Sequence, residues 1–252
     1  MHRGRESSTG SIEHSLLELH KDAGGTLRSS ARDHAKDIGR ILQQEIDLGT
    51  WSERLARRPE MGPFDTGRRE LGFAVYSAST GLYRQAYNSL RLFLELSFAS
   101  VLFSVDEIAM RSWQSDGAHF EWGATLDPKT GILSARTVRL FLPAAVEHAA
   151  EYCGRARRVY DDCSAFTHGR PKELSTLPDR LTYASPVLAD WCSTAQVAAE
   201  CVLFLLFCRF GEELLPADDG RLAATLDFSL SHLRFIRERL GDVSSGEAVR
   251  GG

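Results

Sequence analysis

The segment LYRQAYNSLRLFLELSFASVLFS, residues 82–104, decides the fold class of this chain. Its apolar residues recur at three- and four-residue spacings without strand-type alternation, so the segment predicts one long helix. Similar periodicity continues over most of the 252 residues. We therefore expect an all-α protein: a helical bundle of four to five core helices, with an N-terminal helical arm and one irregular insertion.

Composition predicts how the parts follow one another. Both ends of the chain are rich in Gly, Ser and charge, and RRPEMGPFDTG (57–67) has the Pro and Gly content of a linker. The expected order is a disordered tail (1–10), an N-terminal helical arm (11–58), a helical bundle (66–240) and a second disordered tail (241–252). Gly24-Gly25 is expected to end the first helix of the arm. The sequence leaves open whether this arm packs on the bundle or reaches another subunit.

Caps and periodicity predict the remaining helices of the bundle. The expected helices run from an N-cap at Thr66 to about Ala78, from Thr137 past Pro143 to about Thr167, from an N-cap at Ser185 with Pro186 at the first position to about Leu214, and over 219–240. The irregular insertion (113–136) contains the turn DPKTG, which fits either a small hairpin or a loop.

The overall composition is that of an ordinary globular protein, with 43% hydrophobic and 25% charged residues. A net charge of −4 disfavours a general polyanion-binding surface but leaves a local basic groove open. The odd number of cysteines (five) and the polar start of the chain favour a reducing, cytoplasmic setting. The most apolar run, CVLFLLF (201–207), is too short to span a bilayer and predicts a buried core helix, so we expect no membrane association.

Two of the predicted helices carry a row of polar residues at offsets of 0, 4, 7 and 11, which places each row on one helix face. The first row is Arg84, Asn88, Arg91 and Glu95, and the second is Arg157, Asp161, Ser164 and His168. Because burying an unpaired charge is costly, we expect the two helices to pack with these rows facing across a shared groove.

A simpler interpretation of the rows remains open. Arg91 with Glu95, and Arg157 with Asp161, have the spacing of ion pairs on solvated helix faces, where each pair contributes only a few tenths of a kcal/mol. His168 would then interact with the last carbonyls of its helix. The cluster Arg155, Arg157 and Arg158, with Arg170 and Lys172, is either a phosphate-binding edge that suits RNA or another solvated face.

Two short motifs resemble those of a known group. GLYRQAYNSLRLFLE (81–95) resembles the Gly-x-x-x-x-Ala-x-x-x-x-Arg-x-x-x-Glu helix of HEPN-like proteins from prokaryotic defence and toxin–antitoxin systems. YDDCSAFTHG (160–169) resembles the Tyr-x-x-x-Ser-x-x-x-His-Gly helix end of that group. The resemblance covers about 70–215 and implies a four- to five-helix bundle, often a homodimer, that in active members is a metal-independent ribonuclease.

This chain departs from the active pattern, in which an Arg precedes the His by four to six residues. No arginine stands there before His168, and the one pair at that spacing, Arg28 and His34, lies in the predicted arm. A ribonuclease would therefore use His168 as general acid or base, with Arg84, Arg91 or Arg158 stabilising the phosphorane charge. Ser164 and Tyr160 would position the substrate, and Asn88, Asp161 and Glu95 would line the same groove.

No metal or cofactor is expected. His148 and His168 would lie about 30 Å apart on one helix, too far to share a zinc ion. The chain has no GxxxxGK[ST] or GxGxxG motif. The aromatic residues of the insertion (His119, Phe120 and Trp122) would either cover the groove or plug the bundle.

Two functions remain as hypotheses, beside a plain helical scaffold that binds no ligand. One is a metal-independent ribonuclease that acts on RNA. The other is a catalytically silent module that binds or senses a partner protein in a defence complex, and the absence of the arginine favours it.

Overall fold

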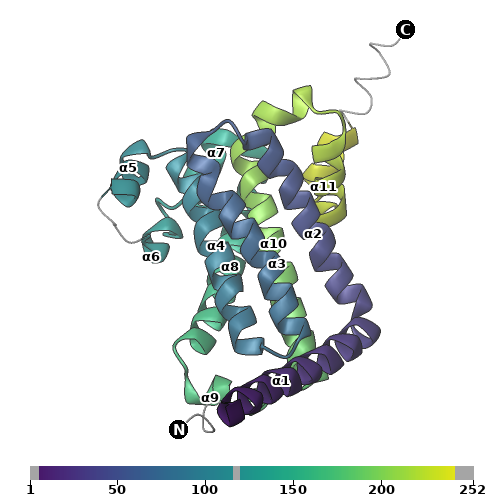
Figure 1. Cartoon of the computed structure of the whole chain (residues 1–252). Coiled ribbons are helices and arrows are strands. Elements are labelled where there is room, and N and C mark those ends of the chain that lie inside the picture. The colour runs from purple at the N-terminus through teal and green to yellow at the C-terminus, as the bar shows by residue number, and fades with distance from the viewer. Residues whose placement is uncertain (1–5, 116–119, 242–252) are drawn as a thin grey trace.

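The computed structural model describes residues 6–115 and 120–241, and within them the regular secondary structure is helical, with no strand (Figure 1). The predicted all-α helical bundle is confirmed. The elements are α1 (Glu6–Asp33), α2 (Ala35–Leu55), η1 (Pro59–Met61), α3 (Gly62–Ser79), α4 (Tyr83–Phe103), α5 (Glu107–Ser115), α6 (Trp122–Thr125), α7 (Ala135–Phe141), η2 (Pro143–Ala145), α8 (Val146–Thr167), α9 (Pro171–Leu174), α10 (Ser185–Leu214), η3 (Leu215–Ala217) and α11 (Arg221–Leu230), and residues 234–241 are also helical.

Helix α10 is the centre of the bundle, with α2, α4 and α8 packed against it (Figure 1). Every residue of CVLFLLF (201–207) is at most 1% exposed, which confirms the predicted core helix. Ser185–Ala217 is long and apolar enough to cross a membrane by length and composition, but 72% of its most apolar window is buried inside the bundle. Such burial is what a core helix of a soluble protein shows.

The sequence left open whether the N-terminal arm packs on the bundle, and the structure shows that its second helix, α2, does so. Ile41, Leu48 and Trp51 are completely buried, against α10, α3 and α11. The Trp51 indole donates a hydrogen bond of 2.9 Å to the Thr225 hydroxyl on α11. The second half of the predicted arm is therefore part of the core.

The first helix differs from the prediction at both ends. It continues through Gly24-Gly25 and breaks at His34, which has φ −123° and ψ 25°. A helical glycine costs about 1 kcal/mol relative to alanine, but the contacts that follow compensate, since the buried Ser30 hydroxyl donates to the Ser79 carbonyl at 2.9 Å. Residues 6–10, expected to be disordered, are helical; residues 1–5 and 242–252 of the predicted tails lie outside the described residues.

Four features of the helices inside the bundle also differ from the prediction. Helix α3 begins at Gly62, not Thr66, because Pro63 is tolerated in a first turn. Pro143 ends α7, since proline disfavours helical geometry in the preceding residue, and α8 begins afresh at Val146. The N-cap of α10 is Ala184, while the Ser185 hydroxyl lies 2.9 Å from the His34 ring nitrogen Nε2. The predicted last helix is interrupted at 231–233.

Over its described residues, the irregular insertion is a loop with short helices, and the DPKTG turn is not part of a hairpin. The Asp127 carboxylate accepts hydrogen bonds from the backbone amides of Lys129 and Thr130, at 2.9 and 2.8 Å, which closes the DPKTG turn. Trp122 is 8% exposed and plugs the bundle beside Phe98, whereas His119 lies outside the described residues.

Candidate functional site

Helices α4 and α8 pack together, and the polar row of α4 faces α8 as expected. Each of its four members hydrogen-bonds to α8: Arg84, Asn88, Arg91 and Glu95. We call this set of bonds, with Tyr160, Phe166 and Thr167 on the other side, the α4–α8 contact. It brings together five of the nine predicted site residues, four on α4 and Tyr160 on α8.

At the middle of the α4–α8 contact, Arg91, Glu95 and Tyr160 bind one another. The Arg91 guanidinium donates to Glu95 Oε1 at 3.0 Å and to the Tyr160 hydroxyl at 2.7 Å, and that hydroxyl donates to Glu95 Oε1 at 2.9 Å. The guanidinium also lies 4.9 Å above the Tyr160 ring, whose other neighbour is the stacked Trp122 ring at 4.3 Å. Burial and the Glu95 carboxylate raise the pKa of Tyr160, so its phenol stays protonated.

At the end of the contact, Arg84 and Asn88 cap helix α8. The Arg84 guanidinium donates to the carbonyls of Phe166 and Thr167, at 3.2 and 3.1 Å, and the Thr167 hydroxyl donates to Asn88 Oδ1 at 2.8 Å. A cation at a helix C-terminus satisfies its unpaired carbonyls and its dipole. Arg84 therefore binds the last carbonyls of α8, which the simpler interpretation of the sequence assigns to His168.

The polar row of α8 forms no hydrogen bond to α4 among the described residues, so the predicted pairing of the two rows is wrong. The side chains of α8 that bond to α4 are Tyr160 and Thr167, and Asp161 follows Tyr160 by about 100° around the helix. Arg157 donates to the Leu126 carbonyl at 2.8 Å instead of pairing with Asp161. Arg158 lies on the α10 side of α8, beside Asp162, and so is separated from the α4–α8 contact.

Within the described part of the chain, neither the Ser164 nor the His168 side chain forms a hydrogen bond to α4. Ser164 is 9% exposed, and its hydroxyl has no hydrogen-bond partner among the described residues. His168 is the exposed C-cap of α8, followed by Gly169 at φ +70°, a left-handed conformation that favours glycine and ends the helix. Among the described residues, the His168 imidazole makes no hydrogen bond or ion pair.

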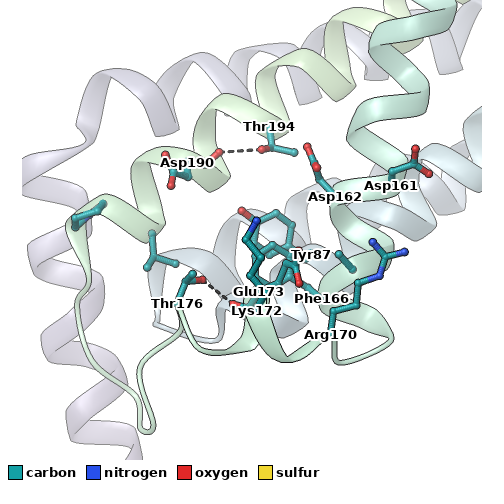
Figure 2. A pocket seen from close by; sticks show the side chains of 13 residues that line it. Tyr87, Asp161, Asp162, Phe166, Arg170, Lys172, Glu173, Thr176, Asp190 and Thr194 are labelled. Carbon is teal, nitrogen blue, oxygen red and sulfur yellow. Dashed lines mark hydrogen bonds between the residues drawn. The ribbon is translucent and has the colours of Figure 1, made fainter.

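An open pocket of about 520 Å³ lies beside the α4–α8 contact, between α8, α9 and the start of α10 (Figure 2). We call it the acidic pocket. Asp162 on α8 and Asp190 on α10 stand on its two walls. Its lining consists of Tyr87, Asp161, Asp162, Ala165, Phe166, Arg170, Lys172, Glu173, Thr176, Pro186, Val187, Asp190 and Thr194.

The acidic pocket combines negative charge with an aromatic wall. Four carboxylates line it against two cations, Arg170 and Lys172. Burial, together with the neighbouring Asp161 carboxylate, raises the pKa of Asp162. The Tyr87 and Phe166 rings stack at 4.0 Å and 10°. Burial raises the pKa of Tyr87, so its phenol remains a neutral hydroxyl beside the carboxylates.

Sequence reasoning missed a second polar cluster, which ties α8 to α10. Glu200 Oε1 accepts hydrogen bonds from Tyr152 and Arg155, both at 2.7 Å, and His232 lies 3.3 Å from the Tyr152 hydroxyl. A charged residue in the most apolar helix was the signal, because such a carboxylate needs a partner. The predicted basic cluster is accordingly divided, with Arg155 bound to Glu200 and Arg157 to a carbonyl.

The acidic pocket was missed for a different reason. Asp190 and Thr194 lie far from Tyr87 and Asp161 in the sequence, and nothing in their own spacing marks them. As for metals, no group of three or more His, Cys, Asp or Glu residues in the described part of the chain is arranged to hold an ion.

Comparison with known proteins gives no relative. No family model, curated protein or solved structure matches this chain. The resemblance to HEPN-like proteins therefore rests on the two short motifs alone.

Proposed function

We propose that this protein is a catalytically silent helical module that binds a basic segment of a partner protein in the acidic pocket. The observation that carries the proposal is that the polar groups on one face of α8 are hydrogen-bonded to α4, while the neighbouring face lines an open pocket. Of the three arginines proposed for a ribonuclease, Arg84 and Arg91 are bound to protein groups in the α4–α8 contact, and Arg158 lies on the α10 side of α8. The pocket on the neighbouring face of α8 is open, and its polar groups point to a ligand of positive charge.

The chemistry of the pocket favours an arginine or lysine side chain. Carboxylates on several elements attract a cation, and an arginine guanidinium can pair with a carboxylate in bidentate geometry. The Tyr87 and Phe166 rings offer an apolar wall for its aliphatic stem. A phosphodiester would instead meet Asp161, Asp162 and Asp190, so this pocket disfavours RNA. That the partner belongs to a prokaryotic defence or toxin–antitoxin system is part of the proposal and follows from the motifs alone.

Calorimetric titration with short peptides tests the proposal. Oligoarginine and oligolysine should bind the 252-residue chain, and oligoglutamate should not. Asp190→Asn should weaken oligoarginine binding about tenfold, because it removes one wall carboxylate. Asp227→Asn, which changes an exposed carboxylate on α11 outside the pocket, is the matched control and should leave the affinity unchanged. Equal binding of the acidic peptide, or equal affinities of the two variants, would contradict the proposal.

A metal-independent ribonuclease is the second candidate, and one observation favours it. The His168 imidazole is exposed at the end of α8, where Arg84 already binds the two preceding carbonyls. The wild-type protein and His168→Ala are incubated with labelled total RNA and tRNA in EDTA. Under our proposal neither cleaves RNA. Cleavage by the wild type alone would make His168 catalytic and would overturn the silent module.

A further inference from the structure

The buried face of α1 continues beyond the bundle as an exposed apolar stripe. Ile12, Leu16 and Leu19 are 61%, 61% and 51% exposed. Farther along the same helix, Thr26 and Ser30 are 4% and 0% exposed and pack on the end of the bundle. With Ala23 between them, these residues follow one another at spacings of 4, 3, 4, 3 and 4, so they share one helix face.

The described residues cover only half of this face. Thr26 and Ser30 meet the turn after α3, where Ser30 binds the Ser79 carbonyl and a Cβ on Gly81 would lie 3.4 Å from the Thr26 methyl group. Helix α1 lies across this end of the bundle (Figure 1), and residues 11–20 are all exposed. The half of the face that carries the large apolar side chains is thus the half that no other described part of the chain covers. A heptad-like stripe of this kind is typical of a helix that pairs with another helix.

We propose that the stripe of Ile12, Leu16 and Leu19 pairs with the same stripe of a second copy of this chain, the two α1 helices running antiparallel. A twofold axis between Leu16 and Leu19 places Leu16 of each chain opposite Leu19 of the other. Ile12 then lies opposite the smaller Ala23. Such a symmetric contact is self-complementary, as closed dimers require.

Charge complementarity selects a second copy over a foreign helix. In this register the residues that flank the stripe on one side are Glu13 and His20, and Glu13 of each chain lies beside His20 of the other. On the other side, Ser15 of each chain lies beside Asp22 of the other. Opposite or neutral groups therefore meet at both edges, and no acidic residue faces another across the seam.

Light scattering during size-exclusion chromatography, over a wide range of protein concentrations, tests the dimer. The 252-residue chain should approach twice its mass of 28.0 kDa at high concentration. Leu16→Ser with Leu19→Ser should weaken association at least about a hundredfold, because each change acts twice in a symmetric dimer. These side chains are exposed in the monomer, so the fold should persist by circular dichroism. Ile108→Ser on α5, which is 80% exposed, is the control and should leave the dimer intact.

Charge variants test the register. His20→Glu should weaken the dimer, because the introduced carboxylate would face Glu13 of the other chain, and adding Glu13→Lys should restore it. A wild-type protein that stays monomeric at all concentrations would overturn the proposal and leave the stripe to a different partner. A dimer that survives both serine substitutions would also overturn it, and failure of Glu13→Lys to rescue His20→Glu would overturn the antiparallel register.

Discussion

At the scale of single residues, the α4–α8 contact shows how polar residues can look catalytic in a sequence and be structural in the fold. Arg91, Glu95 and Tyr160 hydrogen-bond to one another, and each is only partly exposed. Removing one member leaves the others without a partner in a place that water reaches poorly. Their spacing along the helices could be predicted from the sequence, but the hydrogen bonds among them could not.

Arg91→Ala should therefore destabilise the protein by about 1–3 kcal/mol, because Glu95 loses its cation and Tyr160 its donor. Denaturant unfolding measures the change. Arg111→Ala is the matched control, since Arg111 pairs with Glu107 at the same i,i+4 spacing but with 73% of its side chain exposed. Its cost should stay below about 0.5 kcal/mol. Equal costs for the two variants would show that the α4–α8 contact is no stronger than a surface ion pair.

Asp47 on α2 predicts a pH-dependent stability. It is 6% exposed, one oxygen has no partner among the described residues, and burial raises its pKa above the ordinary value of 3.8. Because the folded state holds this proton more tightly than the unfolded chain, stability falls as pH rises from about 3.8 through the folded pKa. Asp47→Asn keeps the shape and should stabilise the protein by about 1 kcal/mol at neutral pH. In unfolding curves against pH, this gain should vanish below about pH 3.8; a constant gain would exclude ionisation as its cause.

At the scale of elements, glycines show why helices were predicted better than their ends. Periodicity located α4 and α10 closely, because burial against several neighbours enforces it. Breaks depend on contacts distant in sequence: Gly24-Gly25 stays helical since Ser30 is held by Ser79, and α1 ends where His34 meets Ser185. No local pattern contains those partners. The acidic pocket could not be predicted from the sequence for the same reason, because its walls come from segments that are distant in sequence.

Two glycine substitutions should act in opposite directions. A Cβ on Gly24 has no atom within 4 Å, so Gly24→Ala should stabilise α1 by about 0.5–1 kcal/mol. A Cβ on Gly67 of α3 would lie 3.1 Å from Leu96 Cβ and 3.2 Å from the Phe93 carbonyl on α4. Gly67→Ala should therefore destabilise by about 1–3 kcal/mol, because α3 and α4 must move apart. Thermal unfolding gives both values, and a stabilising Gly67→Ala would contradict the close packing of these helices.

At the scale of the whole molecule, helix α8 separates two tasks. One face joins α4 and closes the bundle through bonded polar groups, and the next face forms a wall of the acidic pocket; Phe166 takes part in both, with its carbonyl in the contact and its ring at the pocket. The two lie within one helical turn, so a substitution in either could in principle disturb both. The candidate site residues predicted from the sequence mixed residues of the two faces, since Tyr160 belongs to the first and Asp161 to the second.

This separation predicts that stability and binding change independently. Arg91→Ala should lower the free energy of unfolding while leaving the affinity for oligoarginine within about twofold, because Arg91 does not line the pocket. Asp190→Asn should weaken oligoarginine binding while leaving the free energy of unfolding nearly unchanged. Asp190 lines the pocket, and its carboxylate forms no ion pair among the described residues. Unfolding and calorimetry on both variants and on the double variant measure the two effects. If the α4–α8 contact and the acidic pocket are independent, the changes in unfolding free energy and in binding free energy should each be additive in the double variant. A loss of binding in Arg91→Ala, measured at a temperature where this variant is fully folded, would show instead that the α4–α8 contact shapes the pocket.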